Sequence, residues 1–177
     1  MSKIGFCGTV SVGKTTLVKA LQELPEFKDY TFATERSKYL RDLGIPLNTD
    51  STLKGQTVFL SERCSELIAE NVITDRTIID VISFTLNANS IEQSSKLAFE
   101  HYASRFIEEY DWIFYVSPAG VDIEDNNVRT TDAVYRSQID QTIKHLCSCH
   151  LDKIKNFGII SGSTEDRLKQ IKSYLNL

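Results

Sequence analysis

The sequence predicts an α/β domain over residues 1–177, with a mostly parallel sheet that carries helices on both faces. Three observations support this prediction. Short apolar runs are typical of buried strands, and the segments between them place apolar residues at helical spacing. A glycine-rich turn joins the first strand to the first helix. A length of 177 residues suits a single domain with a substantial core.

The predicted elements alternate along the chain, as expected where each helix carries the chain back to the same edge of a parallel sheet. Strands are predicted at Lys3–Cys7, Tyr30–Thr34, Asn71–Thr74, Trp112–Val116 and Phe157–Ile160. Helices are predicted at Lys14–Glu23, Arg36–Leu43, Leu53–Glu70, Val81–Asn87, Ile91–Tyr110, Ala133–Cys149 and Glu165–Leu175. The fifth helix is expected to bury an apolar stripe made of Leu97, Tyr102, Phe106 and Tyr110.

The turn after the first strand has the pattern G-x-x-x-x-G-K-T over residues 8–15. Its glycines let backbone N–H groups face phosphate oxygens at the positive end of the following helix. Lys14 is expected to reach the β- and γ-phosphates, and the Thr15 hydroxyl to hold Mg²⁺. The residues predicted to bind a nucleoside triphosphate here are Gly8, Thr9, Val10, Ser11, Val12, Gly13, Lys14, Thr15 and Thr16.

Charged residues follow the third predicted strand, at the edge of a parallel sheet where ligands bind. Asp75 can associate with Mg²⁺ or accept a proton from a substrate hydroxyl, and a turn cap is the structural alternative. Arg76 can pair with phosphate oxygens. Asp80 is predicted to bind substrate or to cap a helix. Asp111 precedes its strand, so we expect a capping or solvated group there.

Two further turns are expected at the same edge. Glu35 and Arg36 follow the second predicted strand, where they can bind the acceptor or form a structural salt bridge. Gly162 lies in a small-residue turn between the last strand and the last helix. We expect this turn to hold the adenine ring of the donor through backbone contacts.

An acidic, polar segment precedes the sixth helix, and residues 118–136 are predicted to form a lid. Arg129 and Arg136 flank the start of that helix. Because phosphoryl transfer develops negative charge on the moving group, a mobile arginine can neutralise it as a lid closes. Ordinary surface charge is the alternative for both arginines.

Composition narrows the class of protein. A net charge of −4 and an isoelectric point near 5.4 disfavour general binding to nucleic acid or anionic membrane. No apolar run approaches the ~20 residues that a membrane span needs, and the chain enters its first strand almost at once. We therefore expect a cytoplasmic protein without a disulfide framework. The run from His145 to His150 resembles a metal cluster, but on a helix its side chains point in different directions.

Taken together, the phosphate-binding turn, the Glu35–Arg36 and Asp75–Arg76 pairs, Asp80, the arginine lid and the Gly162 turn resemble the P-loop nucleoside and nucleotide kinases. The nearest likeness is to kinases related to the nicotinamide-riboside kinase domain of bacterial NAD-biosynthesis regulators. Thymidylate kinases, which carry an Asp-Arg pair after the third strand, are more distant. This resemblance implies a three-layer P-loop NTPase fold, strand order 2-3-1-4-5, ATP with Mg²⁺ as the phosphoryl donor, and a closing lid.

The predicted function is ATP-dependent transfer of the γ-phosphoryl group to a small nucleoside or nucleotide. Lys14, Asp75, Arg129 and Arg136 would be catalytic, Thr15 and Asp75 would hold the metal, and Glu35, Arg36, Arg76 and Asp80 would bind the acceptor. A kinase acting on a hydroxyl of DNA, RNA or a modified base is disfavoured by the charge. An ATPase switch or interaction module is the second alternative, although the chain has no Asn-Lys-x-Asp guanine motif. A homodimer is left open.

Overall fold

The computed structural model describes residues 2–34, 37–119 and 133–177. Its sheet contains the strands β1 (Lys3–Cys7), β2 (Thr31–Ala33), β3 (Val72–Thr74), β4 (Trp112–Val116) and β5 (Phe157–Ile160). The strands lie in the order β2-β3-β1-β4-β5, and every neighbouring pair is parallel. The predicted fold class and strand order are therefore confirmed, and β1, β4 and β5 have the predicted bounds.

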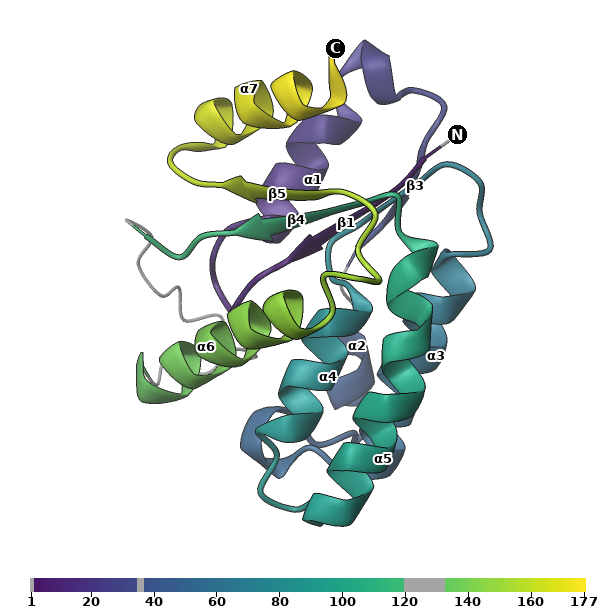
Figure 1. The fold of residues 1–177 in the computed structure, drawn as a ribbon, viewed down its shortest axis with the longest axis vertical. Coiled ribbons are helices and arrows are strands. Elements are labelled where there is room, and N and C mark those ends of the chain that lie inside the picture. The colour runs from purple at the N-terminus through teal and green to yellow at the C-terminus, as the bar shows by residue number, and fades with distance from the viewer. Residues whose placement is uncertain (1, 35–36, 120–132) are drawn as a thin grey trace.

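Helices cover both faces of this sheet (Figure 1). On one face lie α1 (Lys14–Gln22) and α7 (Thr164–Leu175). The other face carries a thicker layer made of α2 (Ser37–Asp42), α3 (Leu53–Glu66), α4 (Ile78–Leu86), α5 (Gln93–Ala103) and α6 (Ala133–Cys149). Short 3₁₀ helices occur at Pro25–Phe27, Asn48–Asp50 and Ser104–Glu109.

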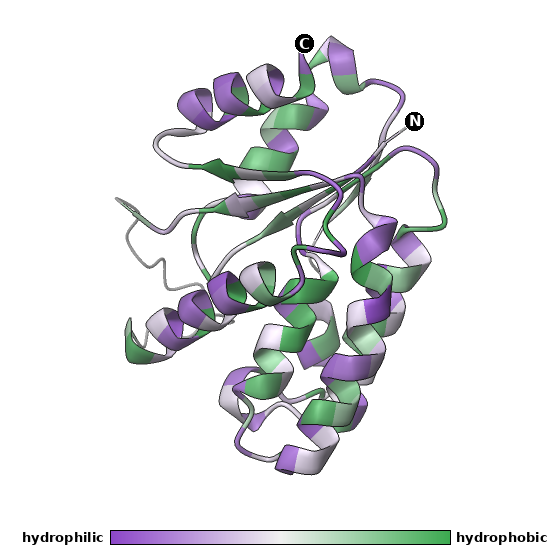
Figure 2. Ribbon diagram, viewed as in Figure 1, coloured by the Kyte–Doolittle hydropathy of each residue, from purple (hydrophilic) through white to green (hydrophobic). Residues whose placement is uncertain are grey.

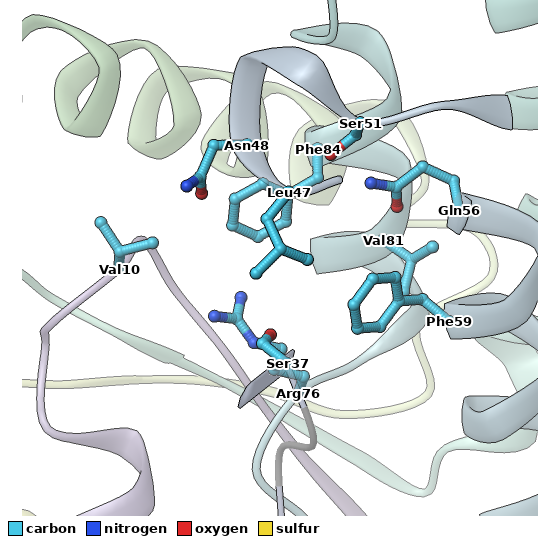
Figure 3. Close-up of a pocket in the computed structure, with 10 residues that line it drawn as sticks. All are labelled: Val10, Ser37, Leu47, Asn48, Ser51, Gln56, Phe59, Arg76, Val81 and Phe84. Atoms are coloured by element: carbon cyan, nitrogen blue, oxygen red, sulfur yellow. The ribbon is translucent and has the colours of Figure 1, made fainter. Parts of the chain in front are cut away.

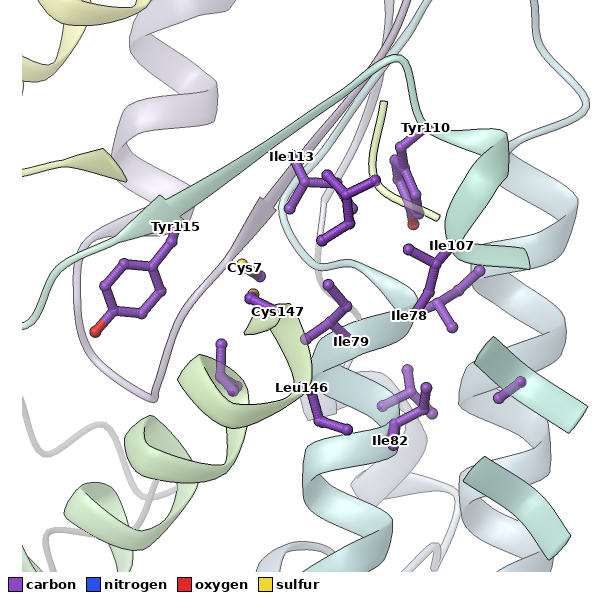
Figure 4. Packing of buried hydrophobic residues seen from close by; sticks show 14 of the residues in the cluster. Cys7, Ile78, Ile79, Ile82, Ile107, Tyr110, Ile113, Tyr115, Leu146 and Cys147 are labelled. Atoms are coloured by element: carbon purple, nitrogen blue, oxygen red, sulfur yellow. The ribbon is translucent and has the colours of Figure 1, made fainter. Parts of the chain in front are cut away.

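Each face of the sheet buries its own apolar cluster. Under α1 and α7, Phe114 stacks on Phe6 and on Trp112, with ring centroids 5.6 and 5.3 Å apart. On the other face, α4 packs against α3, α5 and α6, and its residues Ile79 and Ile82 are fully buried (Figure 4). Apolar and polar residues alternate around the outer helices (Figure 2). Burial on both faces explains why the central strands are continuous apolar runs in the sequence.

The start of α4 differs from the prediction for a local reason. The helix begins at Ile78, three residues before the predicted start at Val81, because Thr77 and Asp80 form a capping box. The Asp80 carboxylate accepts hydrogen bonds from the Thr77 N–H and hydroxyl, at 2.8 and 2.9 Å. Such bonds satisfy N–H groups that the first turn of a helix leaves unpaired.

The apolar stripe predicted on the fifth helix is only partly correct: Tyr110 is buried and Phe106 packs against the core, but Leu97 and Tyr102 do not belong to it. Leu97 is 54% exposed and Tyr102 is 57% exposed, whereas Phe99, Ala103 and Ile107 are buried. The step of five residues from Leu97 to Tyr102 turns a helix by about 140°, so the two side chains cannot share a face. The buried residues instead follow one another at steps of four.

None of the helices in the described ranges is both long and apolar enough to cross a membrane.

Candidate functional site

The turn between β1 and α1 wraps around the N-terminus of the helix. Gly13, the N-cap residue, has a φ of 81°, a left-handed conformation that glycine adopts without strain. At Gly8, an added Cβ atom would lie 2.8 Å from the carbonyl oxygen of Val116. The backbone path therefore requires both fixed glycines of the motif. The carbonyl of Gly13 starts the helix by accepting from the N–H of Leu17 at 3.0 Å.

Lys14 extends its amine across this turn. The side chain is buried, and its Nζ atom donates to the carbonyl oxygens of Gly8 at 2.5 Å and Thr9 at 2.8 Å. The carboxylate of Asp80 lies 4.0 Å from the same amine. The positive charge is thus held at the turn, where inward-facing N–H groups and the helix N-terminus favour phosphate oxygens.

Thr15 and Asp75 meet where β3 ends and α1 begins. The Thr15 hydroxyl donates to Oδ2 of Asp75 at 2.5 Å. Asp75 is fully buried, and within the described residues its Oδ1 has no hydrogen-bond partner. A buried carboxylate oxygen without a partner, beside a hydroxyl, is a suitable donor set for a hard divalent cation. These residues therefore fit the Mg²⁺ expected from the sequence.

Asp80 connects α4 to the phosphate-binding turn. Besides capping its own helix, it accepts a hydrogen bond from the N–H of Gly8 at 3.2 Å, and the guanidinium of Arg76 lies 3.9 Å from the same oxygen. The side chain is fully buried. The structure thus gives Asp80 a cap and a contact with the turn, where the sequence left a cap and substrate binding as alternatives.

A pocket that opens to solvent lies beside this turn. Its lining combines apolar, aromatic, amide and charged side chains (Figure 3). They are Val10, Ser37, Leu47, Asn48, Ser51, Gln56, Phe59, Arg76, Val81 and Phe84. Arg76 lies over the ring of Phe84, 4.9 Å from its centroid. Because Val10 belongs to the phosphate-binding turn, the pocket adjoins the turn directly.

Only Val10 and Arg76 among these lining residues are predicted from the sequence. Gln56 and Phe59 lie on α3 and Phe84 lies on α4, in helices that carry no binding motif. Gln56 is nevertheless only 3% exposed. A glutamine among the apolar positions of α3 was the one available signal, since a buried amide needs hydrogen-bond partners.

The predicted lid and acceptor residues are described only in part. Glu35, Arg36, Arg129 and residues 120–132 lie outside the described residues. Arg136 is described, on the first turn of α6, and its carbonyl accepts from the Thr9 hydroxyl at 2.8 Å. The start of α6 therefore touches the phosphate-binding turn.

The turn from β5 to α7 contains Gly162 at a φ of 87°. The helix that follows it contributes a residue that was not predicted from the sequence. Arg167 is 3% exposed, and its Nη1 donates to the carbonyl of Val12 at 2.6 Å. Its position four residues before the buried Ile171, on the same face of α7, was the available signal.

The cysteines and histidines of α6 do not assemble a metal site. Cys149 lies 3.4 Å from Nε2 of His145, and Cys147 is buried beside Cys7 of β1 (Figure 4). Across the described part of the chain, no three potential ligands of the histidine, cysteine or carboxylate kind come together. Burial raises the pKa of the Cys7 thiol well above its usual value. The cysteine therefore stays protonated and acts as a small core residue.

The sheet order, the glycine turn and its lysine define a P-loop domain. A family model described as an AAA domain matches residues 3–167, and the chain belongs to that family. No curated protein matches the chain.

Solved structures share the fold over the whole chain. A deoxyadenosine kinase from M. mycoides with bound dCTP is 17% identical, with a TM-score of 0.64 and 98% of each chain covered. The same kinase with the products dCMP and dCDP gives 20% identity and a TM-score of 0.60, covering 98% of this chain and 96% of that one. With bound dATP it gives 18% identity and a TM-score of 0.59, covering 99% and 98%.

Proposed function

We propose that this protein is an ATP-dependent kinase that transfers the γ-phosphoryl group to a small nucleoside or nucleotide. The observation that carries the proposal is the pocket beside the phosphate-binding turn. A donor site alone would serve an ATPase equally well. A second site with apolar, aromatic and polar lining, adjoining the first through Val10, supports a reaction between two bound molecules.

The chemistry of the pocket suits an aromatic base. Leu47, Phe59 and Phe84 offer apolar surface to the faces of a planar ring. Gln56 presents both a donor and an acceptor, which can pair with the polar edge of a base. No hydrogen bond to the Gln56 side chain is found within the described residues, so its amide is available for a ligand.

Arg76 carries the charge among the described lining residues and lies where the acceptor's sugar or phosphate would face the donor. It contacts Phe84 on the pocket side and lies 3.9 Å from Asp80, which also contacts the phosphate-binding turn. A guanidinium between the two sites can bind phosphate oxygens through a pair of N–H groups. Arg76 and Asp80 would thus link acceptor recognition to the donor site.

On the donor side, Lys14 and the backbone N–H groups of the turn would hold the β- and γ-phosphates. Thr15 and Asp75 would hold Mg²⁺, which neutralises charge on the phosphates when it is bound. The carboxylate of Asp75 already accepts a hydrogen bond from the Thr15 hydroxyl. We therefore favour metal binding over general-base catalysis as the role of Asp75. Arg136 would neutralise the transferred group from α6, which touches the turn.

The similar solved structures support the substrate class. They hold dCMP, dCDP, dCTP or dATP in a kinase of the same fold. The finer likeness to nicotinamide-riboside kinases or thymidylate kinases stays a prediction.

The decisive test is a screen of nucleosides and nucleoside monophosphates with labelled ATP and Mg²⁺. We expect ADP formation to depend on one class of acceptor, and the label to appear on that acceptor. Equal ATP hydrolysis with and without every acceptor would instead favour the nucleotide-dependent switch. Transfer of label to the end of an oligonucleotide but to no nucleoside would favour the polynucleotide alternative.

A further inference from the structure

Arg167 occupies an unusual position for a charged side chain. It is 3% exposed, and among the described residues no carboxylate lies within ion-pair distance of it. Its Nη1 donates to the carbonyl of Val12 at 2.6 Å, and its Nη2 lies 3.5 Å from the carbonyl of Ser117. Its Nε is buried without a hydrogen-bond partner in the described ranges. A buried charge without a counter-ion is destabilising, so its retention calls for a role beyond packing.

The bond to Val12 determines the direction of the next N–H group. A trans peptide is planar, so the carbonyl of Val12 and the N–H of Gly13 point in opposite directions. With the carbonyl turned toward Arg167, the Gly13 N–H is directed away from α7. The Gly13 carbonyl is already used by the N–H of Leu17 in α1. Both ends of Gly13 are thereby oriented by its neighbours.

The guanidinium of Arg167 also lies close to Gly13, which leaves little room for a side chain there. A Cβ atom at Gly13 would lie 3.1 Å from Nη1 of Arg167, closer than ordinary van der Waals contact. The second glycine of the motif therefore serves two needs: its φ of 81° and the approach of the guanidinium. The sequence pattern explains the first need alone.

We propose, taking the proposed donor nucleotide as given, that Arg167 is a positioning residue for the phosphate-binding turn. From α7 it holds the Val12–Gly13 peptide in the orientation that offers the Gly13 N–H to a triphosphate. Its positive charge lies on the carbonyl side of this peptide, opposite the Gly13 N–H, and adds to the electrostatic attraction for phosphate. Arg167 does not touch the reacting atoms.

The test compares three variants by their affinity for ATP, measured by calorimetry without any acceptor. Arg167→Met keeps an unbranched apolar chain in place of the arginine stem but removes both the donors and the charge. We expect ATP to bind about 10- to 100-fold more weakly, as for loss of a hydrogen bond to a charged group. Arg167→Lys keeps the charge with a single donor group, and should lose at least about threefold but less than the methionine variant. Lys169→Met, on the exposed side of the same helix, is the matched control and should bind ATP like the wild type.

The melting temperatures of these variants without nucleotide distinguish a positioning role of Arg167 from a role in packing. Relief of a buried charge should leave Arg167→Met as stable as the wild type or more stable. A folded methionine variant that binds ATP within about twofold of wild type overturns the proposal. If that variant does not fold, the lysine variant decides: unchanged ATP affinity overturns the proposal, and weakened affinity at an unchanged melting temperature supports it.

Failure of the proposed function has a different signature. A wild-type protein that binds ATP but phosphorylates no acceptor contradicts the kinase assignment, while the dependence of ATP affinity on Arg167 still supports the positioning role. A wild-type protein that binds no nucleoside triphosphate overturns the positioning role as well.

Discussion

The phosphate-binding turn and the pocket beside it are built in different ways. The turn comes from eight consecutive residues, and its polar groups are bonded to one another, as in the contacts from Lys14 to Gly8 and Thr9. The pocket draws its lining from the turn, α2, α3, α4, the segment between α2 and α3, and the turn between β3 and α4. Its buried amide, Gln56, has no partner in the described part of the chain. Under the proposed function, the turn would be preorganised for the donor, and the pocket would determine the choice of substrate.

Lys14→Ala should cost the most, and it tests the donor side. The variant removes the charge held at the turn and should raise the barrier to phosphoryl transfer by ~3–4 kcal/mol, the usual cost of losing one such electrostatic contact. Initial rates at saturating ATP measure the effect. Lys19→Ala, on the exposed side of the same helix, is the control and should leave turnover unchanged. A Lys14→Ala protein with near wild-type turnover would show that this turn does not hold the donor.

Asp75→Asn should come next, with at least ~100-fold loss of turnover, because the amide removes a full negative charge from the metal and a base from the site. The variant keeps the shape of the side chain, so circular dichroism should be unchanged. A shift of the Mg²⁺ dependence to higher concentration would support the metal role. Retained turnover with a much lower melting temperature would mean that Asp75 only caps a turn.

Gln56→Leu tests the acceptor side. Loss of a buried hydrogen-bond partner costs about 1–3 kcal/mol, so KM for the best acceptor from the screen should rise roughly 5- to 150-fold. The affinity for ATP should stay at the wild-type value, since Gln56 lies in the pocket and not in the turn. Gln93→Leu, at an exposed position on α5, provides the control. An equal change in both affinities would contradict the division into two separate sites.

Asp111, at the opposite edge of the sheet, should matter least for turnover. Its carboxylate accepts from the Lys3 N–H at 2.9 Å and from Lys155 at 3.0 Å. Desolvation by burial raises the pKa of Asp111, but these hydrogen bonds outweigh it and hold the pKa below its usual value. A lowered folded-state pKa stabilises the protein above the unfolded-state pKa, and this stabilisation is lost as the pH falls through the folded-state value.

Asp111→Asn should therefore remove part of the acid dependence of the melting temperature below about pH 4. It should change turnover by less than about twofold, in contrast to Asp75→Asn, because Asp111 is distant from the ligand edge of the sheet. Thermal melts from about pH 3 to 7 measure the first expectation. A large loss of turnover would mean that the two edges of the sheet are coupled.

Elements with local signals could be predicted from the chain alone. The strand β1, the turn with Gly8, Gly13 and Lys14, and the start of α1 follow from a contiguous pattern, because phosphate binding needs those residue types at that spacing. Alternating strands and helices likewise predicted a parallel sheet. The order of the strands came from the family resemblance.

Contacts between segments that are distant in the sequence could be seen only in the folded chain. Arg167 is 155 residues from Val12 in the sequence, and the bond between them exists because α7 packs beside α1. The pocket likewise depends on how α3 and α4 pack, so Gln56, Phe59 and Phe84 carry no shared pattern. Leu97 and Tyr102 were wrongly placed in the buried stripe for the same reason, since the neighbouring helices determine which face of α5 is buried. Local chemistry leaves a pattern in the chain, whereas contacts between distant segments are determined by packing.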